Sequence, residues 1–216
     1  MKTTRLSGVT AIFLSGLILV ACSSAPTSPS TTPSATPSPA AEKKEPVLYT
    51  GKNCLSQMAN AAARWQPDAM PVHMESILND ESTGHDGKSS VWRAMFASSS
   101  RSTNRTFTCS GSRLKTEAPI GVTVSAEGGS PADISRSMFQ PMLAIIDSDK
   151  AFATAQENGG ANLFKKDPQQ PVLYSLDWDA KNKELVWTVM YGTSRSDSKG
   201  VGVINASTGK FLRAGK

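Results

Sequence analysis

The sequence predicts an α+β protein made of two tandem helix-plus-antiparallel-sheet modules that follow a disordered tether. One observation is an internal repeat, because the strand-like segment Leu185–Tyr191 matches Val91–Phe96 and places Trp187 in register with Trp92. A second is that each segment follows a stretch with helical spacing and then a stretch of alternating apolar residues. A third is a Ser-, Thr- and Pro-rich run ahead of both, which has too few apolar residues to form a core.

The first 21 residues have the composition of a secretory signal. Lys2 and Arg5 precede an apolar run from Val9 to Val20, which is too short for an ordinary membrane-spanning helix. The run ends in Leu19-Val20-Ala21-Cys22, which resembles the lipobox of bacterial lipoproteins. A plain signal peptide with an incidental cysteine and an uncleaved anchor are the alternatives.

The lipobox resemblance implies that residues 1–21 are removed and that Cys22 is lipidated. Proteins of this family carry a diacylglycerol on the cysteine sulfur and an acyl chain such as palmitate on its amine. Several chains anchor a protein firmly, since each buried methylene contributes about 0.8 kcal/mol. Ser23 stands where an Asp would favour retention in the inner membrane. The resemblance therefore implies a cell-envelope protein that is anchored in the outer membrane and faces the periplasm.

Residues 22–46 form the predicted tether. They are rich in Ser, Thr, Pro and Ala and close with Glu42–Glu45. A Pro-rich chain extends by about 3.1 Å per residue, so the tether could reach on the order of 70 Å from the membrane. A spacer with no recognition role is the interpretation that this composition favours.

Charge and composition exclude a nucleic-acid surface. The formal net charge is +5 for the whole sequence, and removal of Lys2 and Arg5 with the signal peptide lowers it to about +3. No dense basic run with interleaved aromatic residues occurs. The expected partners are the membrane, through the lipid, and a protein or another envelope component.

Cys54 and Cys109 remain as a pair once Cys22 is lipidated. In an oxidising compartment an even pair favours a disulfide, and two unpaired buried thiols are the alternative.

The first module is predicted over residues 47–127. Apolar residues at helical spacing predict a helix from Cys54 to Trp65, with Asn53 as N-cap and Pro67 after its end. The expected strands are Val72–Leu78, Val91–Phe96 and Thr106–Cys109, with an exposed polar hairpin loop at Asn79–Lys88 and a further strand within Ala118–Ser125.

The second module is predicted over residues 128–216. Gly128–Pro131 indicates a turn, and Ile134–Ile146 a short helix with a lead-in segment. A helix capped by Asp147 and Ser148 is expected to end at Gly159–Gly160. The expected strands are Val172–Trp178, Leu185–Tyr191, Val201–Ile204 and a final one at Phe211–Leu212.

This second module resembles the PepSY family, whose members pack one helix on a small antiparallel sheet, as cystatin-like folds do. The similarity lies in Asp147–Asp149, the Gly159–Gly160 pair, the strand Leu185–Trp187 and the closing segment Val203–Leu212. Asn205 stands where the family has Asp. A weaker likeness covers residues 53–112, so the resemblance implies tandem PepSY-like modules. Protease inhibition and binding are ascribed to such modules in extracytoplasmic proteins, which implies binding more than catalysis.

No catalytic, cofactor-binding or metal-binding constellation stands out. His73 and His85 lie near acidic residues, but without metal-ligand spacing, and an exposed polar hairpin explains the pattern better. No serine lies in a Gly-x-Ser-x-Gly pattern, and Gly159–Gly160 has no phosphate-loop context. We therefore expect no enzyme, no cofactor and no metal.

The two matched strands define a core face and a second face. Trp92, Phe96, Trp187 and Tyr191 are expected between helix and sheet. The opposite face carries Val91, Arg93, Met95, Val186, Thr188 and Met190. A half-apolar second face is unusual for a sheet open to water, so it either packs the modules together or forms a binding surface.

The sequence thus favours a non-catalytic, membrane-anchored lipoprotein that binds a protein or envelope component. A structural or assembly accessory of an envelope complex is the alternative, and a hydrolase is disfavoured because no site for one is evident.

Overall fold

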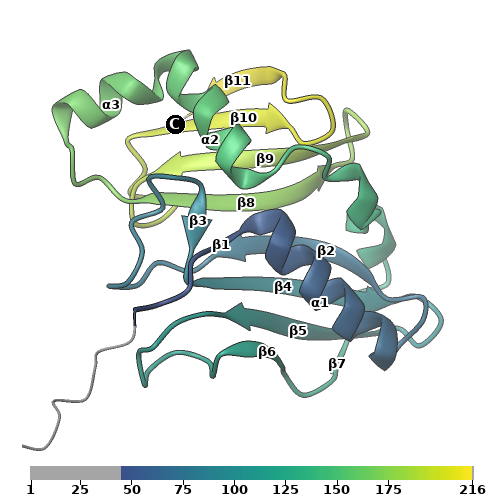
Figure 1. Cartoon of the computed structure of the whole chain (residues 1–216). Coiled ribbons are helices and arrows are strands. Elements are labelled where there is room, and N and C mark those ends of the chain that lie inside the picture. The colour runs from purple at the N-terminus through teal and green to yellow at the C-terminus, as the bar shows by residue number, and fades with distance from the viewer. Residues whose placement is uncertain (1–44, 216) are drawn as a thin grey trace, which may run out of the picture. The chain divides into compact units, whose positions relative to one another are not determined.

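A computed structural model describes residues 45–215, which form one antiparallel sheet of nine strands with three helices against one of its faces (Figure 1). The predicted signal peptide, Cys22 and the tether up to residue 44 lie outside the described residues.

The elements follow the expected order, helix before strands, twice along the chain. The helices are α1 (Gly51–Trp65), α2 (Ser148–Ala155) and α3 (Ala161–Lys166), with a π turn at Gln156–Gly160 and 3-10 turns at Ile134–Ser137 and Pro141–Leu143. The strands in the first half are β1 (Tyr49–Thr50), β2 (Met70–Ser76), β3 (Lys88–Ser89), β4 (Val91–Ser98), β5 (Thr103–Ser110), β6 (Gly121–Val124) and β7 (Gly128–Gly129). Those in the second half are β8 (Val172–Asp179), β9 (Glu184–Tyr191), β10 (Gly200–Asn205) and β11 (Phe211–Gly215).

The two halves are joined edge to edge in one sheet. Its strand order is β11-β10-β9-β8-β2-β4-β5-β6, with β7 also on β5, while β1 and β3 form a separate pair. The seam is the antiparallel pairing of β2 with β8, in which Met74 faces Leu176. The described residues 45–215 belong to one compact unit. The halves expected at 47–127 and 128–216 therefore share a sheet rather than stand apart.

One core lies between the helices and this sheet, and it contains residues of both halves. Trp92 and Trp187 are fully buried, and their rings meet edge to face with centroids 6.2 Å apart. Helix α1 adds the large buried side chains of Leu55 and Met58. The others come from the central strands: Met74, Phe96, Phe107, Tyr174, Leu176, Leu185, Tyr191 and Ile204. The four aromatic residues expected in the core are thus buried.

The two tryptophans also make equivalent hydrogen bonds. Trp92 Nε1 donates to the carbonyl of Tyr49, and Trp187 Nε1 to that of Ile146, each at 2.9 Å. Tyr49 and Ile146 each lie two residues before the start of a helix. Each indole therefore fixes the lead-in of its own helix against the sheet.

The N-termini of α1 and α2 meet at the seam and share one cap. Asp147 Oδ1 accepts from the Ser148 N–H at 2.7 Å and from the Lys52 N–H of α1 at 2.8 Å. Ser148 Oγ accepts from the Gly51 N–H and donates to the Gly87 carbonyl. One carboxylate thus satisfies free N–H groups at the positive ends of both helices, where negative charge is stabilising.

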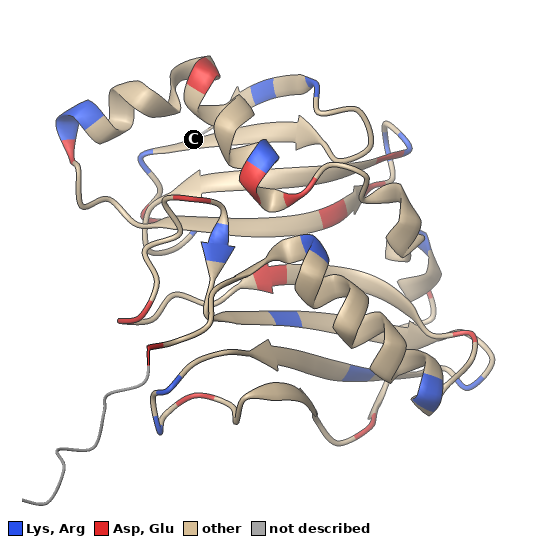
Figure 2. Cartoon of the chain, viewed as in Figure 1, with Lys and Arg blue, Asp and Glu red and all other residues tan. Residues whose placement is uncertain are grey.

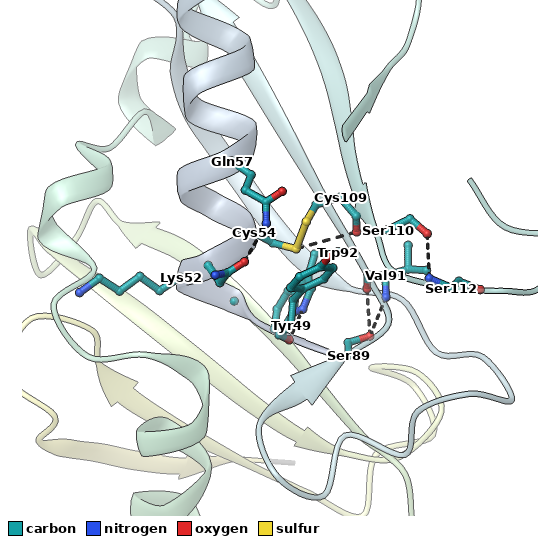
Figure 3. Close-up of a disulfide and its surroundings, with 12 residues drawn as sticks. Tyr49, Lys52, Cys54, Gln57, Ser89, Val91, Trp92, Cys109, Ser110 and Ser112 are labelled. Atoms are coloured by element: carbon teal, nitrogen blue, oxygen red, sulfur yellow. Dashed lines mark hydrogen bonds between the residues drawn. A yellow bond between two sulfur atoms is a disulfide. The ribbon is translucent and has the colours of Figure 1, made fainter. Parts of the chain in front are cut away.

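The expected disulfide joins Cys54 of α1 to Cys109 of β5, with Cα atoms 5.6 Å apart (Figure 3). Both cysteines are buried in the core next to Trp92. The bridge therefore fixes the start of α1 to the sheet of the first half.

Several local expectations were wrong. Helix α1 begins at Gly51 after Thr50, and Asn53 lies inside it, where its side chain accepts from Gln57. The helical segment does not end at Gly159–Gly160 but kinks there, because Gly159 has a φ of +113°, and continues as α3. Ile134–Ile146 forms two 3-10 turns, and Gly128–Gly129 pairs with β5 instead of only turning.

The segment Asn79–Lys88, expected as an exposed hairpin, folds onto the second half. The Thr83 carbonyl accepts from the Val172 N–H, and the Gly84 carbonyl from the Tyr174 hydroxyl. The His85 ring lies 4.7 Å from that of Phe164. We call residues 79–88 the clamp loop, since it ties the first half to β8 and α3.

We predict that loss of the disulfide destabilises the whole domain. A bridge that closes a loop of this length contributes about 4 kcal/mol in the chain-entropy model. The double change Cys54→Ala/Cys109→Ala should lower the free energy of unfolding by about that amount in urea titrations. Because the core is shared, tryptophan fluorescence and circular dichroism should report one transition. Two separated transitions would show that the halves unfold independently.

We predict that Trp92→Ala and Trp187→Ala each cost about 3–5 kcal/mol, because each removes a fully buried ring. The double variant should lose less unfolding free energy than the sum of the losses in the two single variants. The reason is that the rings touch each other and their contact is lost only once. Denaturant unfolding of the four proteins in the cycle measures this. Strict additivity would mean that the ring contact does not couple the halves.

Candidate binding face of the sheet

All six residues predicted for the second face lie on one side of the continuous sheet, opposite the helices. Strand pairing shows this, because residues directly opposite in adjacent strands point to the same side. One such row runs Thr188, Ser175, Glu75, Arg93 and Thr108 from β9 to β5. Another runs Val186, Asp177, His73, Met95 and Thr106.

Across residues 45–215, no α-helix lies on this side. The buried residues of α1 and α2 belong to the core that contains both tryptophans, and Leu163 and Phe164 of α3 pack against that same core. The buried apolar residues Val91, Val186, Met190 and Val203 are absent from this core cluster. The halves pack side by side, so the second face is not used to stack one module on the other.

The six residues differ in how much surface they present. Arg93 is half-exposed and Met95 is partly exposed, whereas Val91, Val186, Thr188 and Met190 are each under 9% exposed. Further partly exposed side chains contribute surface, five from the two rows and two, Leu173 and Val201, that flank Met190 on the same side of the sheet: Leu173, Val201, His73, Glu75, Asp177, Thr106 and Thr108. The sequence missed these because only the register of the central strands places them beside the predicted residues.

A charged cluster occupies the seam in the middle of this face. His73 Nδ1 of β2 lies 2.6 Å from Asp177 Oδ1 of β8, and its Nε2 lies 3.6 Å from Glu75. Arg93 is 3.8 Å from the other oxygen of Glu75. The hydrogen bond to Asp177, followed by that to Glu75, raises the pKa of His73 to about 9, while His73 lowers the pKa of Glu75.

This cluster links strands of the two halves through charged side chains. Both imidazole nitrogens face carboxylates on opposite sides of the ring, which leaves neither free for a metal, and no group of three or more possible metal ligands occurs in residues 45–215. Ser175 Oγ donates to Asp177 Oδ2 and not to the imidazole of His73.

A hollow of about 470 Å³ lies beside the clamp loop. Leu48, Leu78 and Pro171 give it an apolar wall, and Asp80, His85 and Asp86 are polar lining residues. His85 Nε2 bonds the carbonyl of Gln170, and Lys88 pairs with Asp86 at 3.2 Å. His85 therefore serves to hold the clamp loop, which corrects its assignment to an exposed hairpin.

Charged residues of both signs are interspersed on the side of the domain seen in Figure 2, with no block of one sign. Glu127 of the first half illustrates the pattern, since it accepts from Trp65 Nε1 and pairs with Arg101 and Arg105. None of the helices in the described part of the chain is long and apolar enough to span a membrane.

Comparison with known proteins shows a likeness in fold. No family model matches the chain, and no curated protein does. A crystal structure of a putative lipoprotein from Clostridium difficile 630 is similar, with a TM-score of 0.50 at 12% sequence identity. The match covers 81% of this chain and 95% of that protein. At this identity the similarity concerns the fold alone.

We predict that His73 makes the stability of the domain depend on pH. The pKa of His73 in the folded protein, about 9, exceeds its ordinary value of 6.5, so its contribution to stability is fully present below about pH 6.5 and is lost as the pH rises through 9. Because the ring is about a third exposed, solvent screening reduces this contribution to about 1 kcal/mol. His73→Gln should remove that part of the difference in unfolding free energy between pH 6 and pH 9.5. An unchanged difference would show that the imidazole is not held between the carboxylates.

Proposed function

We propose that this protein is a lipid-anchored, non-catalytic lipoprotein of the bacterial cell envelope that binds a protein partner through the second face of its sheet. The observation that carries the proposal is the face itself, eight strands wide, with no α-helix of residues 45–215 over it. An antiparallel sheet that is open to water on one side normally carries polar residues there. Here Leu173, Met95 and Val201 contribute apolar surface beside the charged seam.

The anchor rests on the resemblance of Leu19–Cys22 to a lipobox, and the similar Clostridium difficile fold, described as a putative lipoprotein, agrees with it. Lipidation of Cys22 and a tether over residues 22–46 would hold the domain at the membrane with the sheet free to engage a partner. We place the protein in the outer membrane, facing the periplasm, because Ser23 lacks the inner-membrane retention signal.

The PepSY-like interpretation is part of this proposal. The succession of helix and four strands occurs in both halves, and the tryptophans at matching strand positions make matching bonds to the helix lead-ins. The resemblance to PepSY modules supports a binding function. In the described residues, no group of three or more possible metal ligands occurs.

We predict that partner contacts map to the sheet and not to the helices. A photo-crosslinking amino acid placed at Met95 or Leu173 of the full-length protein in intact cells should give the same discrete adduct. The matched control is Lys150, an exposed residue of α2 on the opposite side of the domain. Adducts of equal yield from Lys150, or none from both sheet positions, would contradict binding through this face.

A further inference from the structure

The two outer edges of the sheet are protected to different degrees. At the β11 edge, Arg213 is exposed beside the exposed Lys210, and a register shift interrupts the pairing of β10 with β11. Charged residues and irregularities of this kind are how natural sheets prevent pairing with other strands. At the β6 edge, no charged residue occurs from Ala118 to Ala126.

The uncharged β6 edge also exposes apolar side chains. Ile120 is 49% exposed and Val124 is 50% exposed, and both are among the largest exposed apolar residues of the domain. Within residues 45–215, β6 pairs only with β5, so its outer N–H and C=O groups have no strand partner there. A row of backbone donors and acceptors is matched best by another extended backbone.

We propose that this edge pairs with β6 of a second copy of the chain to form a two-fold symmetric dimer with one continuous sheet. Antiparallel pairing centred on Thr123 sets Val122 opposite Val124 of the second copy, and Val124 opposite its Val122. The pairing with Cys109 and Phe107 puts both valines on the helix side, whereas Thr123, opposite Thr108, lies on the other side. Valine would thus meet valine and threonine would meet threonine, which are favourable cross-strand pairs.

A second copy fits this edge for two reasons. The segment is uncharged, so self-pairing sets no like charges opposite each other, which would be destabilising. The chain itself already uses this mode of association, because β2 and β8 join its two halves edge to edge, antiparallel, with the helices on one side. The interface is distinct from the face proposed above for the partner protein, and neither proposal depends on the other.

Sedimentation equilibrium of the full-length protein in mild detergent tests the proposal. The wild type should be a dimer, and Val124→Lys should raise the dimer dissociation constant at least tenfold, because each lysine would lie opposite Val122 of the other copy and diagonal to the second lysine, so that like charges come close at an apolar edge. Val124 is half-exposed, so the variant should keep the wild-type circular dichroism spectrum. The matched control is Met142→Lys, which adds the same charge at a residue that is 77% exposed and away from β6, and it should dimerise as the wild type does.

A cysteine in place of Thr123 gives a second readout that needs no destabilising change. Under the proposed register, Thr123→Cys proteins should form an intermolecular disulfide in the cell envelope, whereas Thr208→Cys, in an exposed turn beside β11, should not. A wild type that stays monomeric at all concentrations would overturn the proposal. So would a dimer that is insensitive to Val124→Lys, or a Thr123→Cys adduct with a different protein, which would assign the edge to another occupant.

Discussion

The structure depends on the way the two buried tryptophans tie each helix to its own sheet and to each other. Each indole N–H binds the carbonyl that lies two residues before a helix, so the position of the helix start follows from the position of the ring. The rings then meet across the seam. Because the helix starts are fixed in this way, their free N–H groups converge on Asp147 and Ser148, and the halves acquire a common polar cap above a common apolar core.

A one-sided sheet follows from this arrangement. When two helix-on-sheet units join by antiparallel edge strands, their helices must lie on the same side if the tryptophans are to touch. The opposite side then extends without interruption across both halves, and polar residues of β2 and β8 come together in its centre. His73 and Asp177 lie on strands of different halves, and their 2.6 Å contact exists only because the edges pair.

The clamp loop makes the two halves unequal. The turn between β8 and β9 is short, whereas the first half has residues 79–88 at the corresponding place between β2 and β4. This insertion covers Tyr174, reaches the N-terminus of α2 through the bond from Ser148 Oγ to the Gly87 carbonyl, and forms one side of the hollow lined by Leu48 and Leu78. A duplicated architecture has therefore acquired one asymmetric surface feature where the halves meet.

The sequence by itself determined the elements whose signals are local. The strands around Trp92 and Trp187, the burial of these rings, the cap at Asp147 and the pairing of Cys54 with Cys109 follow from periodicity, cap chemistry and the number of cysteines. The sequence also distinguished the core-facing residues of β4 and β9 from those on the second face, because side chains alternate between the two sides of a strand. Only the tertiary structure decided that these sides form one face, that the clamp loop packs on the second half and that the helix continues past Gly159. The shared face and the packing of the clamp loop depend on contacts between residues about 80 to 105 positions apart in the chain. At the kink after Gly159, Gly160 packs closely against Tyr191. Such contacts leave no periodic trace in the sequence, since strand pairing between distant segments depends on which strand edges are free and close together in the folded domain.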